Sequence, residues 1–148
     1  MASIRIQLSG FRELGERMRA LSDEVNLKLA RSTTNAGAQV IKNLAVRYAP
    51  GSAWADTPRV PPNNLKKNII VRKRSEPRYT SEHTVTVRSK GKGVVGNPYT
   101  TGVQQEFGNV NHGPTAFMRP ALDQGKSEAL EVMKQRLAAG IRIASKKK

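Results

Sequence analysis

The stretch SDEVNLKLARSTTNAGAQVIKNLAVRYAP, residues 22–50, holds the longest helical pattern of the chain. Apolar side chains recur along it at the spacing of one helical face, at Val25, Leu29, Ala36, Val40 and Leu44. Ser22 is a favourable N-cap, and helices usually end before a proline such as Pro50. We therefore predict a long helix over residues 23–48. Its middle, RSTTNAGAQ, is rich in small residues, which would let a helix of the same chain or of another subunit approach closely.

A second long helix and several short strands are predicted around this helix. Residues 119–144 repeat apolar side chains at helical spacing, and residues 11–21 do so over a shorter length. Strand patterns occur at residues 4–8, 68–75 and 83–90. GKG at 91–93 favours a hairpin turn into VVG, and Pro98 suits the first turn of a short helix over residues 98–107. The predicted fold class is α+β, a small antiparallel sheet packed with a long helix in the N-terminal half and a long C-terminal helix.

Length and composition favour one domain over residues 1–148, with a long proline-rich loop at 49–64 and a basic tail at 145–148. The loop holds Trp54, the only tryptophan, which would be a docking anchor if exposed and a core contact if folded back. No apolar run is long enough to span a membrane, and the first residues lack the pattern of a secretion signal. We expect a soluble protein made and assembled in a cytoplasm. The absence of cysteine excludes disulfides and thiol catalysis.

Positive charge is the most unusual bulk property of the chain. Lys and Arg number 26 against 11 acidic residues, which gives a net charge of +15. Such a charge favours contact with polyanions or, alternatively, with acidic partners in an assembly. The middle third is the most basic, and its predicted sheet carries the candidate DNA-facing residues Arg72, Lys73, Arg74, Arg88, Lys90 and Lys92. Aromatic residues do not alternate with these charges, apart from Tyr79, so any DNA contact is expected to be with the backbone.

Groups for catalysis are scarce. The two histidines, His83 and His112, belong to no spacing that would bind a metal. SKGKGVVG does not match a phosphate-binding loop and leads into a predicted strand rather than a helix. The acidic residues are scattered, whereas a metal nuclease needs two or three that converge. We therefore expect no enzyme activity, cofactor, metal or small-molecule substrate.

The stretch YTTGVQQEFGNVNHGPTAFMRPALD, residues 99–123, is the densest in chemical groups, and we interpret it as a shaped element rather than an active site. Tyr99, Val103 and Phe107 are predicted to anchor the short helix against the sheet. Phe117 and Met118 would fill the core or a neighbouring subunit. Glu106 and Arg119 would pair with each other, pair across a subunit boundary, or remain solvated. The candidate residues for a subunit or partner interface are Trp54, Glu106, Phe107, Phe117 and Arg119.

The order of several short motifs indicates a family. A predicted N-terminal strand precedes F-x-x-L, and the long helix ends in VRYAP. NNLKKNII, YTTGVQQEFGN and TAFMRPALD follow. In this order the chain resembles the gene-product-ten-like family of minor tail or tail-completion (neck) proteins from long-tailed phages and prophages. It departs from the family pattern at Asn64, at Asn109 after EFG, and at Ala116 before Phe117.

The resemblance implies a non-enzymatic virion component of the head–tail junction, assembled in the bacterial host cytoplasm. It implies a homo-oligomeric ring, expected to be a hexamer, that joins a head-closure or connector protein to a tail terminator or tail-tube protein. DNA would pass through this ring and touch its basic residues without sequence recognition, while the proline-rich loop and the termini would contact neighbouring rings. The alternatives are a tail terminator or head-closure subunit of the same assembly, and a small basic DNA-binding protein that acts alone.

Overall fold

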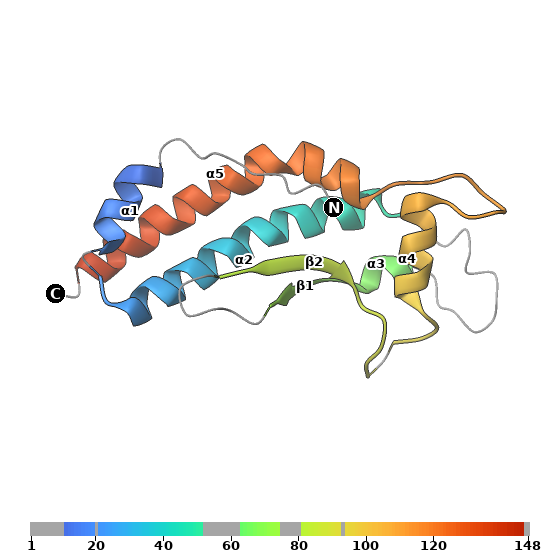
Figure 1. The fold of residues 1–148 in the computed structure, drawn as a ribbon, viewed down its shortest axis with the longest axis horizontal. Coiled ribbons are helices and arrows are strands. Elements are labelled where there is room, and N and C mark those ends of the chain that lie inside the picture. The colour runs from blue at the N-terminus through green and yellow to red at the C-terminus, as the bar shows by residue number, and fades with distance from the viewer. Residues whose placement is uncertain (1–10, 20, 52–62, 75–80, 93, 147–148) are drawn as a thin grey trace.

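The computed structural model describes residues 11–19, 21–51, 63–74, 81–92 and 94–146. The elements in chain order are α1 (Phe11–Arg19), α2 (Asp23–Tyr48), α3 (Asn64–Lys67), β1 (Ile69–Lys73), β2 (His83–Val87), α4 (Pro98–Phe107) and α5 (Met118–Ser145). The predicted α+β class is confirmed, with long helices in both halves and a small antiparallel sheet (Figure 1). The strand predicted at residues 4–8, Trp54 and Tyr79 lie outside the described residues.

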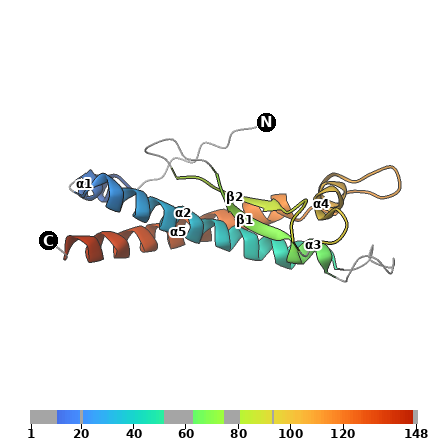
Figure 2. The ribbon, with the colours of Figure 1, turned by 90° about the horizontal axis from the view of Figure 1, so that it is seen from below.

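The two long helices, α2 and α5, lie side by side and antiparallel (Figures 1 and 2). Their contact is close because glycines of one helix face bulky side chains of the other. A Cβ atom added to Gly37 of α2 would lie 2.5 Å from Sδ of Met133, and one on Gly125 of α5 would lie 2.6 Å from Cδ1 of Leu44. Gly140 of α5 meets Leu29 in the same way. The small residues in the middle of α2 therefore serve a contact within the chain.

The local sequence sets the ends of α2 where they were predicted. Ser22 is the N-cap, and its side chain accepts a hydrogen bond from the Val25 N–H. Asp23 and Glu24 complement the positive end of the helix dipole in the first turn. The helix ends at Tyr48, two residues before Pro50. In the described residues, no helix is both long and apolar enough to cross a bilayer.

The sheet consists of β1 and β2, paired antiparallel with Ile69 opposite Val87 and Lys73 opposite His83. It lies against α2, on one side of the layer formed by the long helices (Figure 2). The core cluster lies where the sheet, α3, the end of α2 and the start of α5 meet. Its buried members are Ala45, Ala49, Leu65, Ile69, Phe117 and Ala121.

The segment after β2 differs from the prediction. Gly91 and Lys92 form a turn, but Val94 and Val95 are not in a strand, so the hairpin expected at residues 91–93 was wrong. Instead the chain runs to Asn97, whose side chain accepts a hydrogen bond from the Thr100 N–H and caps α4. Helices α3 and α4 therefore lie at one end of the molecule, while α1 packs on α5 at the other end (Figure 1).

Candidate assembly interface

Helix α4 packs on the rest of the chain through a narrow face without large apolar side chains. The buried residues of this face are Pro98, Gly102, Gln105 and Glu106. A Cβ atom on Gly102 would lie 3.1 Å from Val87 and 3.3 Å from Leu65, so the backbone of α4 approaches the sheet and α3 closely. Gly108 has a φ of 80°, which glycine adopts readily, and it ends the helix.

The large apolar residues of α4 are exposed at the rim of an open pocket beside β2 and are not buried against the sheet, so the prediction that Tyr99, Val103 and Phe107 anchor the helix was wrong. These side chains are 50%, 41% and 67% exposed, and we call them the α4 stripe. The prediction failed because it assumed that the largest apolar side chains would face the sheet. Here the close approach at Gly102 requires the smallest residue, and Glu106 must face inward to reach α5.

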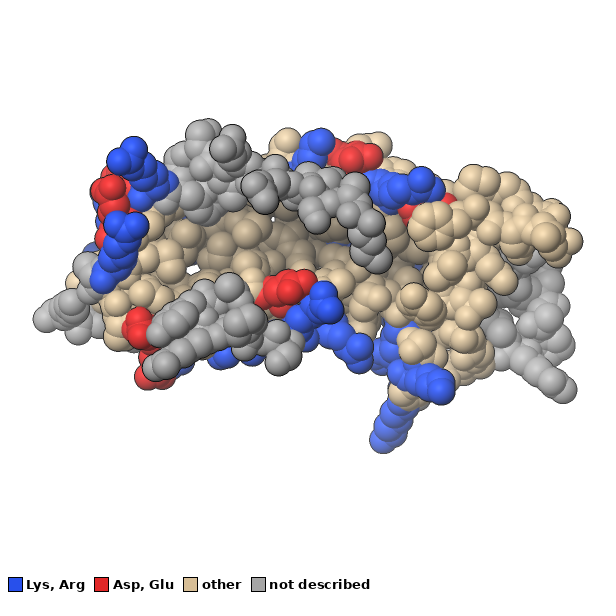
Figure 3. Space-filling view, in the orientation of Figure 1, with Lys and Arg blue, Asp and Glu red and all other residues tan. Residues whose placement is uncertain are grey.

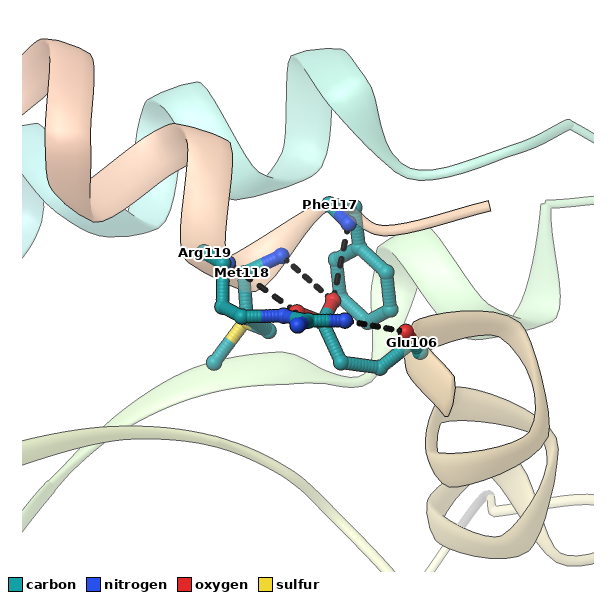
Figure 4. Close-up of polar contacts among 4 residues, drawn as sticks. All are labelled: Glu106, Phe117, Met118 and Arg119. Carbon is teal, nitrogen blue, oxygen red and sulfur yellow. Dashed lines mark hydrogen bonds and ion pairs between the residues drawn. The ribbon is translucent and has the colours of Figure 1, made fainter. Parts of the chain in front are cut away.

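Glu106 holds the start of α5, and Figure 4 shows the contacts. Its Oε2 accepts hydrogen bonds from the N–H groups of Phe117 at 2.8 Å and Met118 at 2.9 Å. Its Oε1 accepts from the Arg119 N–H at 3.2 Å and from Nε of the same arginine at 2.9 Å. A further bond joins Nη2 of Arg119 to the Glu106 carbonyl at 2.9 Å. We call this set of contacts the Glu106 clamp.

The clamp replaces a cap that the sequence of α5 lacks. Phe117 occupies the N-cap position, and no side chain there bonds to the helix. The first N–H groups of a helix have no partner within it, and the helix dipole favours a negative charge at this end. Glu106, which is only 5% exposed, supplies both an acceptor and a charge from another helix.

The protonation of Glu106 reflects these contacts. Burial raises the pKa of its carboxyl, but the hydrogen bonds from Met118, Phe117 and Arg119 lower it by more. Its pKa therefore lies below the ordinary value of 4.5. The carboxylate is charged at neutral pH, when it binds the helix start most strongly.

The clamp brings together four of the residues predicted from the sequence. Glu106 and Arg119 pair within the chain, and Phe117 is 1% exposed in the core of the same chain rather than in a neighbour. Arg119 also extends over the exposed ring of Phe107, with 5.3 Å between Cζ and the ring centroid. The clamp thus fixes one edge of the α4 stripe.

The predicted basic residues lie on and beyond the sheet rather than in a closed site. Arg72, Lys73, Arg74, Arg88, Lys90 and Lys92 are all exposed. Arg74 pairs with Glu82 at 3.3 Å, and Lys90 and Lys92 belong to the turn after β2. Lys and Arg side chains gather along the sheet edge of the molecule in Figure 3.

The two histidines have local partners. His83 Nδ1 lies 2.8 Å from Oγ1 of Thr34, which ties β2 to α2. His112 Nδ1 lies 2.9 Å from the Gly113 carbonyl in the loop between α4 and α5. Across the described part of the chain, no three His, Cys, Asp or Glu side chains are grouped as metal ligands would be.

Comparison with known proteins identifies the family of the chain. The family model described as "Bacteriophage HK97-gp10, putative tail-component" matches residues 12–108. The chain belongs to this HK97-gp10-like family. The match begins in α1 and ends just after α4, so it contains the α4 stripe and Glu106 but not α5. Neither the curated proteins nor the solved structures compared with the chain include a match.

Family membership confirms the resemblance read from the motifs. The HK97-gp10-like family is a family of structural tail components, which implies a place in the virion and a role other than catalysis. The sequence alone did not reveal how α4 is oriented. The signals were Gly102 within a short helix, which suggests a close approach, and the lack of a capping residue before Met118, which requires an acceptor from elsewhere.

Proposed function

We propose that this HK97-gp10-like protein is a tail-completion (neck) subunit at the phage head–tail junction. It assembles into a ring, with six copies as the expected number, and the ring joins a head-closure or connector protein to a tail terminator or tail-tube protein. The α4 stripe is its principal contact with a neighbouring subunit or ring. Trp54 of the proline-rich loop would be a second contact.

The observation that carries this proposal is the exposed α4 stripe. Tyr99, Val103 and Phe107 present two aromatic rings and a valine on one face of a helix. Aromatic residues and arginine are enriched in protein interfaces, and Arg119 lies beside Phe107. The clamp holds this face in place, so little conformational freedom would be lost on binding. A stripe at one end of the molecule suits the head-to-tail contacts that close a ring.

The basic residues support a channel through which DNA passes. Arg72, Lys73, Arg74, Arg88, Lys90 and Lys92 would face the DNA backbone, with Arg74 weakened in this role by Glu82. Contacts of this kind give affinity that falls with salt and does not depend on base sequence. They would ease the passage of the genome rather than hold it at one place.

The proposal is tested by assembly of the full chain, alone and mixed with its head-closure and tail-terminator neighbours. Native mass spectrometry should show a ring for the unchanged protein and a monomer for Phe107→Asp. Gln104→Asp is the matched control, because Gln104 is also exposed on α4 and lies outside the stripe. Phage that carry Phe107→Asp should accumulate filled heads and tails that are not joined. Equal assembly of both variants would contradict the role given to the stripe.

A DNA-binding protein that acts alone is the second candidate, favoured by the net charge of +15. It predicts tight binding of the monomer to duplex DNA with a steep salt dependence. The triple change Arg72→Ala, Arg88→Ala and Lys92→Ala should then reduce that dependence. Tight DNA binding by a monomer that ignores the connector proteins would favour this candidate over the ring.

A further inference from the structure

One edge of β2 has no partner among the described residues. Strand β1 pairs with the other edge, where Arg88 donates its N–H to the Asn68 carbonyl. Hydrogen-bonded pairs alternate along an antiparallel ladder, so Thr84 and Thr86 direct their backbone groups toward β1. The N–H and C=O groups of His83, Val85 and Val87 therefore point away from β1, toward the start of α5.

This edge of β2 faces two hollows: residues 85–87 line a pocket of about 270 Å³ together with the α4 stripe. Along residues 81–85, a groove of about 580 Å³ lies between β2 and α5. Its floor is α2, and its walls are mainly apolar. The apolar lining includes Ile41, Val85, Met118, Leu122, Leu130 and Met133. In Figure 3 the surface is hollowed between α5 and the sheet. An unpaired strand edge beside an apolar groove is the arrangement that accepts an added β-strand.

We propose that residues 4–8 of the same chain, Ile-Arg-Ile-Gln-Leu, occupy this groove as a third strand beside β2. Three features match. The segment alternates apolar and polar residues, as a strand with one buried face does. It has the same length as β2, which has five residues. Only Ser9 and Gly10 separate it from α1, which packs on α5, the helix that forms one wall of the groove.

The position of α1 sets the direction of the added strand. Helix α1 lies toward the end of the molecule where β2 begins, and β2 runs away from it (Figure 1). Leu8 must then lie near the start of β2 and Ile4 near its end, so the pairing is antiparallel. The expected pairs are Ile4 with Val87, Arg5 with Thr86, Ile6 with Val85, Gln7 with Thr84 and Leu8 with His83. This register places all three apolar side chains of the segment on the same face of the sheet as Val85, which lines the groove, and Val87, which lines the pocket beside α4.

Amide hydrogen exchange of the full chain, measured by NMR, tests the pairing. Thr84 and Thr86 bond to β1 and serve as internal references. If the strand is added, the Val85 amide exchanges as slowly as theirs, on the order of 100-fold or more below an unstructured amide. Ile6→Asp should release the Val85 amide and leave Thr86 protected, whereas Gln7→Asp, on the outer face, should change neither. Fast exchange at Val85 in the unchanged protein would overturn the proposal.

Crosslinking identifies which chain supplies the strand. Because the chain has no native cysteine, only the two introduced cysteines can form a disulfide. Gln7→Cys combined with Thr84→Cys should oxidise to one disulfide, because this pair is not hydrogen-bonded and its side chains are close. In a mixture of ¹⁴N- and ¹⁵N-labelled protein, the linked peptides should carry a single label. Gln7→Cys with Arg72→Cys, one strand further away, is the control and should not link. Mixed-label peptides would show that a second copy supplies the strand. Failure of Gln7→Cys to link with Thr84→Cys would show that residues 4–8 do not pair with β2. Either result would overturn the proposal. Both measurements concern the single chain, so they stand whether or not a ring forms.

Discussion

Helix α5 is held along its length by α2 and at its start by Glu106 of α4, and the two contacts differ in kind. Along α2 the contact consists of apolar side chains placed over glycines, such as Leu44 over Gly125. At α4 it consists of one buried carboxylate and the N–H groups of the helix start. The first contact tolerates small adjustments because side-chain ends can shift. The second depends on one residue, because in the described part of the chain the N-cap residue of α5, Phe117, makes no side-chain bond to the helix and the acceptor is Glu106.

The difference also explains which surfaces remain free. Apolar packing along α2 covers part of the apolar face of each long helix and leaves another part to line the groove beside β2. The polar clamp joins α4 to the body without its large apolar residues, which leaves the α4 stripe exposed. A protein that must present an apolar surface to a partner can do so only if something other than that surface holds the helix. The Glu106 clamp meets this requirement.

Removal of Glu106 should have the largest effect. Glu106→Ala leaves the N–H groups of Phe117 and Met118 without acceptors beside a buried core. Loss of one partner from a buried charged contact costs about 3–5 kcal/mol. We expect a decrease of this size in the free energy of unfolding, measured by urea denaturation. Glu106→Gln keeps one acceptor oxygen and should cost less, so equal losses for the two variants would contradict the clamp.

The same contact should make stability depend on pH. Because the pKa of Glu106 is lower in the folded chain than its ordinary value of 4.5, the folded state binds fewer protons there than the unfolded state. Its contribution is then complete above the unfolded pKa and is lost as the pH falls through the folded pKa. The stability difference between the unchanged protein and Glu106→Gln should narrow from about pH 6 to about pH 3. A constant difference over this range would mean that the charge of Glu106 does not stabilise α5.

The contact between the long helices should respond more moderately. Gly125→Ala places a methyl group within 2.6 Å of Leu44 and 2.8 Å of Ile41, and we expect a loss of about 1–3 kcal/mol from overpacking. Gly37→Ala meets only the flexible side chain of Met133 at this range and should cost less. Gly15→Ala in α1 is the control, because no atom lies within 4 Å of the added group. It should stabilise the helix by up to about 1 kcal/mol. Thermal unfolding of the three variants would check this order.

The sequence predicted the contact between the long helices better than it predicted the Glu106 clamp. The helix over residues 23–48 follows from its apolar spacing and Ser22, and the small residues at its middle correctly suggested a close helix contact. The orientation of α4 did not follow, because Glu106 bonds to residues 11–13 positions further along the chain. Local patterns report which residues share a face, whereas the choice of the buried face depends on what lies opposite. The missing cap at Phe117 was the one local sign that a distant acceptor was needed.

The smallest effect on stability is expected in the α4 stripe, where the effect on assembly should be greatest. Phe107→Ser removes a ring that is 67% exposed and lies beside the Arg119 guanidinium. Surface changes of this kind usually alter the free energy of unfolding by no more than about 0.5 kcal/mol. Urea denaturation should therefore scarcely distinguish Phe107→Ser from the unchanged protein, while native mass spectrometry shows the loss of the ring. If Phe107→Ser instead destabilised the monomer as strongly as Glu106→Ala, the stripe would belong to the support of α4, and its role as a partner surface would be lost.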